Sequence, residues 1–138
     1  MNRSNFKKMA RKRLIDAKTL LDKGRYSAAY YLCGYVVECG LKACIAKQTN
    51  KFDFPPGLNA IKEIYTHDLS KLVKSAGLKL TLDEDLKKKP KLQCNWAIVK
   101  DWKETSRYEP HTSKEAKSLY NAISHKTHGV MQWISQYW

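Results

Sequence analysis

The sequence predicts an all-α protein folded as a single domain over residues 1–138. Apolar side chains recur at helical spacing, and no segment alternates as a half-buried strand does. Two capping-box patterns, Thr81-x-x-Glu84 and Thr112-x-x-Glu115, mark helix starts. A chain of 138 residues with 43% hydrophobic side chains fits one domain with a real core. We therefore expect an up-and-down bundle of about five helices, with a long and central second helix.

The first two helices are expected over about residues 5–23 and about residues 25–48. Gly24 lies between them and suits the left-handed position that ends a helix. The second helix is apolar on most faces, as a central helix would be, and Gly34 and Gly40 within it would permit close approach of a neighbour. The apolar stripe of the first helix comprises Phe6, Met9, Leu14, Ala17, Leu20 and Leu21.

The middle of the chain contains proline residues, which break helices more strongly than the glycines of the second helix do. Pro55-Pro56 interrupts the helical pattern over residues 51–57, and residues 61–65 are compatible with a short helical turn. A short helix should then start with Thr66 as the N-cap and stop at Gly77. This part of the chain is expected to contain one long loop.

Two more helices are expected after the short one. Thr81 should start a helix that Pro90 interrupts or restarts, and its apolar face continues to about Lys103. Residues 104–111 form a connection, and Thr112 opens the last helix. That helix is expected to be continuous and to carry Ala116, Leu119, Tyr120, Ile123, Val130, Trp133, Ile134 and Tyr137.

Basic side chains outnumber acidic ones twofold, with 26 Lys and Arg against 13 Asp and Glu and a net charge of +13. Such a charge favours polyanionic partners such as RNA or DNA; a solvated basic surface is the alternative. The N-terminal run has no acid before Asp16 and opposes the helix dipole. Residues 87–91 would join it if the fold brings them close. The run comprises Arg3, Lys7, Lys8, Arg11, Lys12 and Arg13.

The cysteines contain no CxxC pair, so we interpret them as small buried residues of a reducing compartment rather than zinc ligands. His125 and His128 would share a helix face, which is half a metal site without further ligands. We expect no metal and no cofactor. No apolar signal segment and no membrane-length stretch is visible, which predicts a cytoplasmic protein. The cysteines are Cys33, Cys39, Cys44 and Cys94.

Glu38 and Lys42 are charged residues inside the apolar second helix. Their i,i+4 spacing and order favour an ion pair, and unpaired buried charge is costly. Arg107 could compete with Lys42 for Glu38, or stack on an aromatic ring. We expect a structural ion-pair network, with anion binding by spare donors of Arg107 and Lys42 as the alternative. His67, at a helix start, is expected to bond a backbone group.

Tyr30, Tyr31 and Tyr35 stand at helical spacing on the second helix. We interpret them as core or dimer-interface aromatics, with base stacking as the alternative. This helix is apolar around most of its circumference, and the last helix is rich in aromatic residues. Together they present more apolar surface than one small bundle can bury. A homodimer is therefore expected.

Residues 17–46 follow the pattern A-x-x-L-L-x-x-G-x-Y-x-x-A-x-Y and, further on, E-x-x-L-K-A. Further along the chain come the motif His67-Asp68-Leu69-x-x-Leu72 and then Trp102, which four residues separate from Arg107-Tyr108. In order and spacing these motifs resemble the HEPN family, small helical domains linked to nucleotides and RNA cleavage. The resemblance implies a HEPN-like bundle. It also implies a ligand site, for which we expect Arg107, Tyr108, Lys42 and Glu38, and an RNA-contacting patch of Lys7, Lys8, Arg11 and Lys12.

The resemblance leaves three functions open. The first is a dimeric module that binds a nucleotide or RNA and pairs with a minimal nucleotidyltransferase, as in toxin–antitoxin-like gene pairs. The second is a metal-independent endoribonuclease toxin using Arg107 and His111. The third is a structural dimerisation domain without a ligand. In ribonuclease members four to six residues separate the Arg and His, whereas here only three do, including Pro110. We therefore favour the first, and expect no enzyme activity from the chain alone.

Overall fold

The computed structural model describes residues 1–52 and 65–138, and these form seven α-helices, one 3-10 helix and no strand. The all-α prediction is confirmed. The count exceeds the expected five because two predicted helices are each divided in two. The break expected at Pro55-Pro56 lies outside the described residues, and so does all but Tyr65 of the turn expected over residues 61–65.

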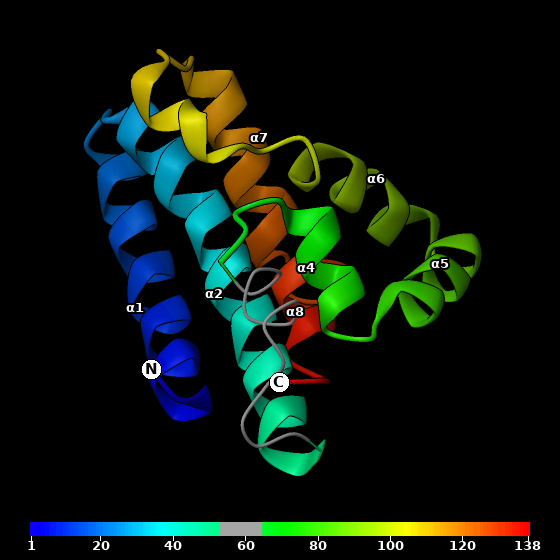
Figure 1. Cartoon of the computed structure of the whole chain (residues 1–138). Coiled ribbons are helices and arrows are strands. Elements are labelled where there is room, and N and C mark those ends of the chain that lie inside the picture. Colours follow the sequence, from blue (N-terminus) through cyan, green and yellow to red (C-terminus); the bar gives the residue numbers. More distant parts are fainter. Residues whose placement is uncertain (53–64) are drawn as a thin grey trace.

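Helices α1 (Arg3–Asp22) and α2 (Tyr26–Phe52) form an antiparallel hairpin (Figure 1). Gly24 has a φ of +75°. The Gly24 N–H donates to the Leu21 carbonyl and the Arg25 N–H to the Leu20 carbonyl. These two bonds are the Schellman ending of a helix, so glycine is required where the sequence predicted it.

Helix α2 is the centre of the bundle and packs against α1, α4, η1, α7 and α8. The ring of Trp102 lies flat on α2 at Gly34, where an added Cβ would stand 2.0 Å from the indole. At Gly40 an added Cβ would stand 2.9 Å from the Met131 methyl group. Both glycines therefore permit the close approach that was expected of them.

The next helix, α4 (Leu69–Ser75), is capped by Asp68 and not by Thr66. The Asp68 carboxylate accepts from the Lys71 N–H at 3.0 Å, while the Thr66 hydroxyl accepts from the Asp68 N–H. Thr and Asp are both good N-cap residues. Asp68, two residues after Thr66, is the one whose side chain reaches a free N–H group of the first turn. The predicted stop at Gly77 is confirmed, with a φ of +71°.

Helices α5 (Lys79–Lys88) and α6 (Pro90–Val99) replace the single helix expected from Thr81. Thr81 lies inside α5, which begins earlier, and no side chain caps that start. Leu78 and Leu82 are buried here, so packing rather than capping decides where α5 begins. Pro90 restarts the helix as predicted, because a proline at the first position needs no N–H partner.

The 3-10 helix η1 (Glu104–Tyr108) leads to α7 (Ser113–Ser124) and α8 (Val130–Ile134). The Thr112 cap of α7 is confirmed, with its hydroxyl accepting from the Glu115 N–H at 3.1 Å. The continuous last helix was wrong. The chain leaves α7 at His125, whose ring Nδ1 accepts from the N–H groups of Thr127 and His128. These side-chain bonds offer the backbone an alternative to a further helical turn.

Within the described part of the chain, no helix combines the length and apolarity that a membrane crossing needs. The start of α1 and the end of the chain lie close together, because Arg3 Nε donates to the main-chain oxygen of Trp138 at 3.0 Å. The junction of α5 and α6, which carries residues 87–91, lies on the other side of the molecule from α1 (Figure 1). The fold therefore does not bring residues 87–91 close to the N-terminal run, and the condition for their joining it is not met.

Candidate functional site

Glu38 lies at the centre of a polar network on α2. Glu38 is only 1% exposed, although its side chain is a carboxylate. Lys42, one turn along the same helix, places its Nζ 2.8 Å from Glu38 Oε1. The ion pair expected from the i,i+4 spacing is confirmed, and it keeps the buried charge from standing alone.

His67, in the segment just before α4, meets the same carboxylate. Its Nδ1 lies 2.7 Å from Glu38 Oε1, and its Nε2 lies 3.2 Å from Glu104 Oε2. The expectation that His67 bonds a backbone group was therefore wrong. The residue sits just before α4, where the chain passes between α2 and η1, so its ring reaches carboxylates on both.

Arg107 occupies the outer end of the network and not its centre. Its guanidinium lies 3.6 Å from Glu104 Oε1 and stacks 4.8 Å from the Tyr108 ring centroid. The expected direct pairing with Glu38 was wrong, because His67 and Glu104 stand between the two. Tyr108, and to a smaller degree Glu104, raises the pKa of Arg107, which stays a cation.

The four predicted ligand-binding residues thus divide into a buried and an exposed pair. Glu38 and Lys42 are enclosed, with side chains 2% and 14% exposed, while Arg107 and Tyr108 face solvent. Arg107 Nη1 lies 3.6 Å from Glu104 Oε1, and a guanidinium has five donors. The buried pair can anchor the network, and the exposed pair can meet an anion or a ring.

His111, the alternative catalytic residue, is packed into the fold. Its ring stacks on Tyr30 with centroids 3.7 Å apart, and its Nδ1 lies 2.9 Å from Glu115 Oε2. Its main-chain N–H donates to the Ser27 hydroxyl. Its Nε2 is buried and has no partner among the described residues. The residue precedes the Thr112 cap, outside α7 as expected, with Nδ1 held by Glu115 and Nε2 buried.

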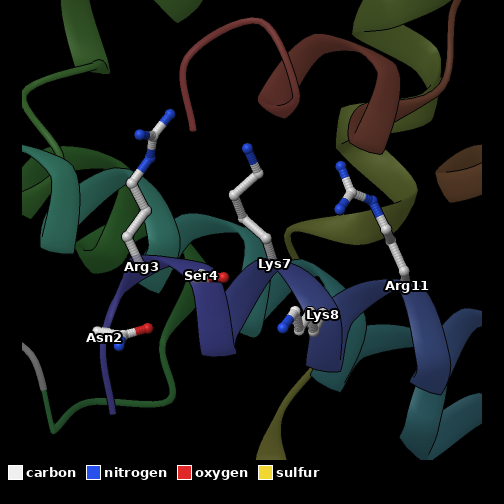
Figure 2. Close-up of a pocket in the computed structure, with 6 residues that line it drawn as sticks. All are labelled: Asn2, Arg3, Ser4, Lys7, Lys8 and Arg11. Atoms are coloured by element: carbon white, nitrogen blue, oxygen red, sulfur yellow. The ribbon is translucent and has the colours of Figure 1, made fainter.

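The basic run on α1 separates into two surfaces. Arg3, Lys7 and Arg11, spaced one turn apart, point together toward the end of the chain, whereas Lys8 points away from them (Figure 2). The hollow along this stretch has a volume of about 510 Å³. The remaining two basic residues differ: Arg13 pairs with Asp16, and Lys12 is exposed.

Trp138 lies against these three cations. Arg3 bonds its main-chain oxygen, and Lys7 Nζ and the Arg11 guanidinium lie 5.4 Å and 5.0 Å from its ring centroid. Both positions are within cation–π range. Burial, followed by the charges of Arg3, Arg11 and Lys47, lowers the pKa of Lys7. The α1 surface is therefore a cluster of like charges around an indole.

The remaining aromatic residues belong to the packing of the bundle. Tyr30 stacks on His111, and Tyr31 lies 6.5 Å from Tyr35 and 6.0 Å from Trp102 between ring centroids. All three tyrosines pack against the hydrophobic core. The core interpretation is confirmed for them.

The cysteines are all free, and three of them are buried as expected. Burial raises the pKa of Cys33 to about 12 and of Cys39 and Cys44 to about 11. Cys94 is exposed, contrary to the expectation. His125 and His128 lie in the break after α7 and not on a helix, with ring centroids 5.4 Å apart. In the described ranges, no three side chains are arranged to hold a metal ion.

Sequence reasoning missed two residues of these sites, Glu104 and Trp138. Glu104 stands three residues before Arg107, which is the contact spacing of a 3-10 turn, so the pair could have been proposed. Trp138 has no local signal, because its contacts are with α1 at the other end of the chain.

The chain was compared with known proteins. No curated protein and no solved structure matches it. The family model described as HEPN domain matches residues 4–136, which is nearly the whole chain. The helical hairpin, the third-helix motif and the Arg107-Tyr108 segment all lie within that match, and the chain therefore belongs to the HEPN family.

Proposed function

We propose that this HEPN protein binds RNA or a nucleotide and acts as a dimeric interaction module, with a minimal nucleotidyltransferase as its partner. The observation that carries the proposal is the uncompensated charge of α1. Within the described residues, neither Lys7 nor Arg11 contacts a carboxylate, and Lys8 and Lys12 are exposed. Clustered cations that lack acidic partners are the electrostatic footprint of a phosphate-binding surface.

The Glu38 network supplies a second contact region in this proposal. Arg107 and Tyr108 are exposed side by side on η1. A guanidinium can bind a phosphate and an exposed phenol ring can stack on a base. Glu38 and Lys42 hold η1 in place through His67 and Glu104. The buried half of the network thus positions the exposed half.

The dimer is proposed to form over the same end of the bundle. Tyr65 and Tyr108 are 74% and 76% exposed; Tyr65 stands two residues before His67 in the chain, and Tyr108 contacts Arg107. Tyrosine and arginine are enriched in protein interfaces. The nucleotidyltransferase partner rests on the HEPN resemblance alone; co-purification with such a protein would test it.

The binding proposal is tested with a fluorescein-labelled single-stranded RNA titrated at several salt concentrations. The Lys8→Gln/Lys12→Gln variant should bind more weakly, with a salt slope smaller by about 1.4 if both lysines contact phosphates. The matched control is Lys87→Gln/Lys88→Gln, which removes the same charge at the end of α5, on the other side of the molecule (Figure 1). Equal weakening by both variants would indicate diffuse attraction, and no binding by wild type in dilute buffer would reject the proposal.

A further inference from the structure

A second hollow lies beside the α1 cations, between α1, α2, α7 and α8. Its volume is about 380 Å³, and its apolar wall is formed by the partly exposed side chains of Leu14 and Met131, with the buried Val36 and Ile123 also lining it. Trp138 forms another part of the wall. An apolar hollow of this size, with a few polar groups at its edge, is the usual form of a small-ligand site.

The edge of this hollow carries the polar and charged side chains. Arg11 comes from α1, His125 and Lys126 from the break after α7, and Gln132 from α8. Lys126 and Gln132 are exposed. The arrangement places hydrogen-bonding groups and two cations around an apolar interior. It suits a ligand with a flat, weakly polar ring and an anionic group attached to it.

The two hollows are neighbours on α1, since Arg11 lines both. Arg3, Lys7 and Arg11 follow one another along α1 at steps of four residues, or about 6 Å. Trp138 lines the hollow between α1, α2, α7 and α8 and contacts all three cations. The row of cations is longer than a single phosphate group, and it ends at an aromatic ring. A nucleotide strand, with several phosphates, therefore fits this surface better than a free nucleotide with one phosphate.

Electrostatics favours an anion here. Lys7 experiences Arg3, Arg11 and Lys47 as like charges, and burial and these cations lower its pKa. Repulsion of this kind is relieved when phosphates neutralise the cations and release their counterions.

We infer that the hollow beside Trp138 binds one nucleotide of a single-stranded RNA. Its base lies against the apolar wall and stacks on the indole, and its phosphate is held by Arg11 and Lys126. The neighbouring phosphates continue along Lys7 and Arg3. This inference rests on the proposed RNA binding and assigns to it a site for an unpaired base. The site should accept any of the four bases, because each has a ring face that can stack on an indole.

The test titrates wild type and the variants Trp138→Leu, Trp138→Phe and Lys126→Gln with the labelled RNA. Trp138→Leu should weaken binding roughly tenfold or more, and Trp138→Phe should restore part of it, because a ring can still stack. Lys126→Gln should weaken binding several-fold. Its control, Lys100→Gln, removes an exposed charge after α6 and should change nothing.

A second measurement follows tryptophan fluorescence with unlabelled RNA. The other three tryptophans, Trp96, Trp102 and Trp133, are buried, so stacking should quench mainly Trp138 and the quench should disappear in Trp138→Phe. Circular dichroism checks that each variant is folded. If Trp138→Leu unfolds, Lys126→Gln and the quench decide the question.

The outcomes separate the two proposals. RNA binding that depends on Lys8 and Lys12 but is unchanged by Trp138→Leu and Lys126→Gln would overturn the nucleotide site and leave RNA binding intact. Absence of RNA binding by wild type would overturn both. A ribonucleoside monophosphate that binds as tightly as the strand would overturn the assignment to RNA.

Discussion

Removal of the Glu38 carboxylate should destabilise the protein far more than removal of a surface carboxylate. Glu38 is 1% exposed, and Lys42 and His67 both depend on its Oε1. In Glu38→Ala, Lys42 loses its carboxylate partner, His67 keeps only its contact with Glu104, and a cavity replaces the side chain. Breaking a buried ion pair by removing one partner costs about 3–5 kcal/mol.

The structure favours the lower end of that range. The Lys42 side chain is 14% exposed and that of His67 is 43% exposed, so both can recover some hydration. We therefore expect a loss of about 3 kcal/mol in the free energy of unfolding. For a domain of this size, that corresponds to a fall in Tm of about 10 °C.

Urea denaturation followed by circular dichroism measures the loss. Glu109→Ala is the matched control, because Glu109 is exposed and has no described ion pair; it should change stability by less than about 0.5 kcal/mol. Glu38→Gln keeps the volume and removes the charge, so it separates the cavity from the electrostatic effect. A loss for Glu38→Ala no larger than that of the control would refute the reasoning and show a hydrated carboxylate.

Four further predictions concern activity, assembly, thiol reactivity and the pH dependence of stability. The purified chain should not cut a mixed RNA pool in EDTA, because the His111 ring is packed against Tyr30 and Glu115; cutting that is lost in His111→Ala would contradict this. Sedimentation at micromolar concentration should give a dimer, and Tyr108→Ala should shift it toward monomer; a wild-type monomer throughout would reject the interface. At pH 8 a thiol reagent should modify Cys94 alone in the native protein, because Cys94 is exposed and the other cysteines are buried. Since burial raises the pKa of Cys33 to about 12, stability should fall as pH rises above the unfolded value of about 8.5, and stability that is flat between pH 8 and 10.5 would contradict that shift.

Features that depend on near neighbours were predictable from the sequence. Gly24 and Gly77 end helices by adopting a left-handed conformation. That conformation lets nearby N–H groups bond the last carbonyl groups of the helix, so it depends only on adjacent residues. Pro90 and Thr112 start helices for equally local reasons, a missing N–H and a capping hydroxyl. The Glu38–Lys42 pair follows from the pitch of one helix. The all-α class and the central helix are the sum of such signals.

The composition of the sites was decided by contacts between distant segments. His67 meets Glu38 and Glu104 only because α4 and η1 both pack on α2, and no spacing in the sequence encodes that distance. Trp138 meets Arg3 across 135 residues of chain.

The last helix shows the same limit within one segment. Its periodicity is compatible with a continuous helix, yet the chain turns at His125, whose ring binds the free N–H groups that the turn exposes. The turn lets Val130, Trp133 and Ile134 enter the core from a new direction. Sequence by itself thus determined the helices and their local ends. Tertiary packing decided which charged and aromatic side chains meet, because the burial that favours one arrangement exists only once all the helices are in place.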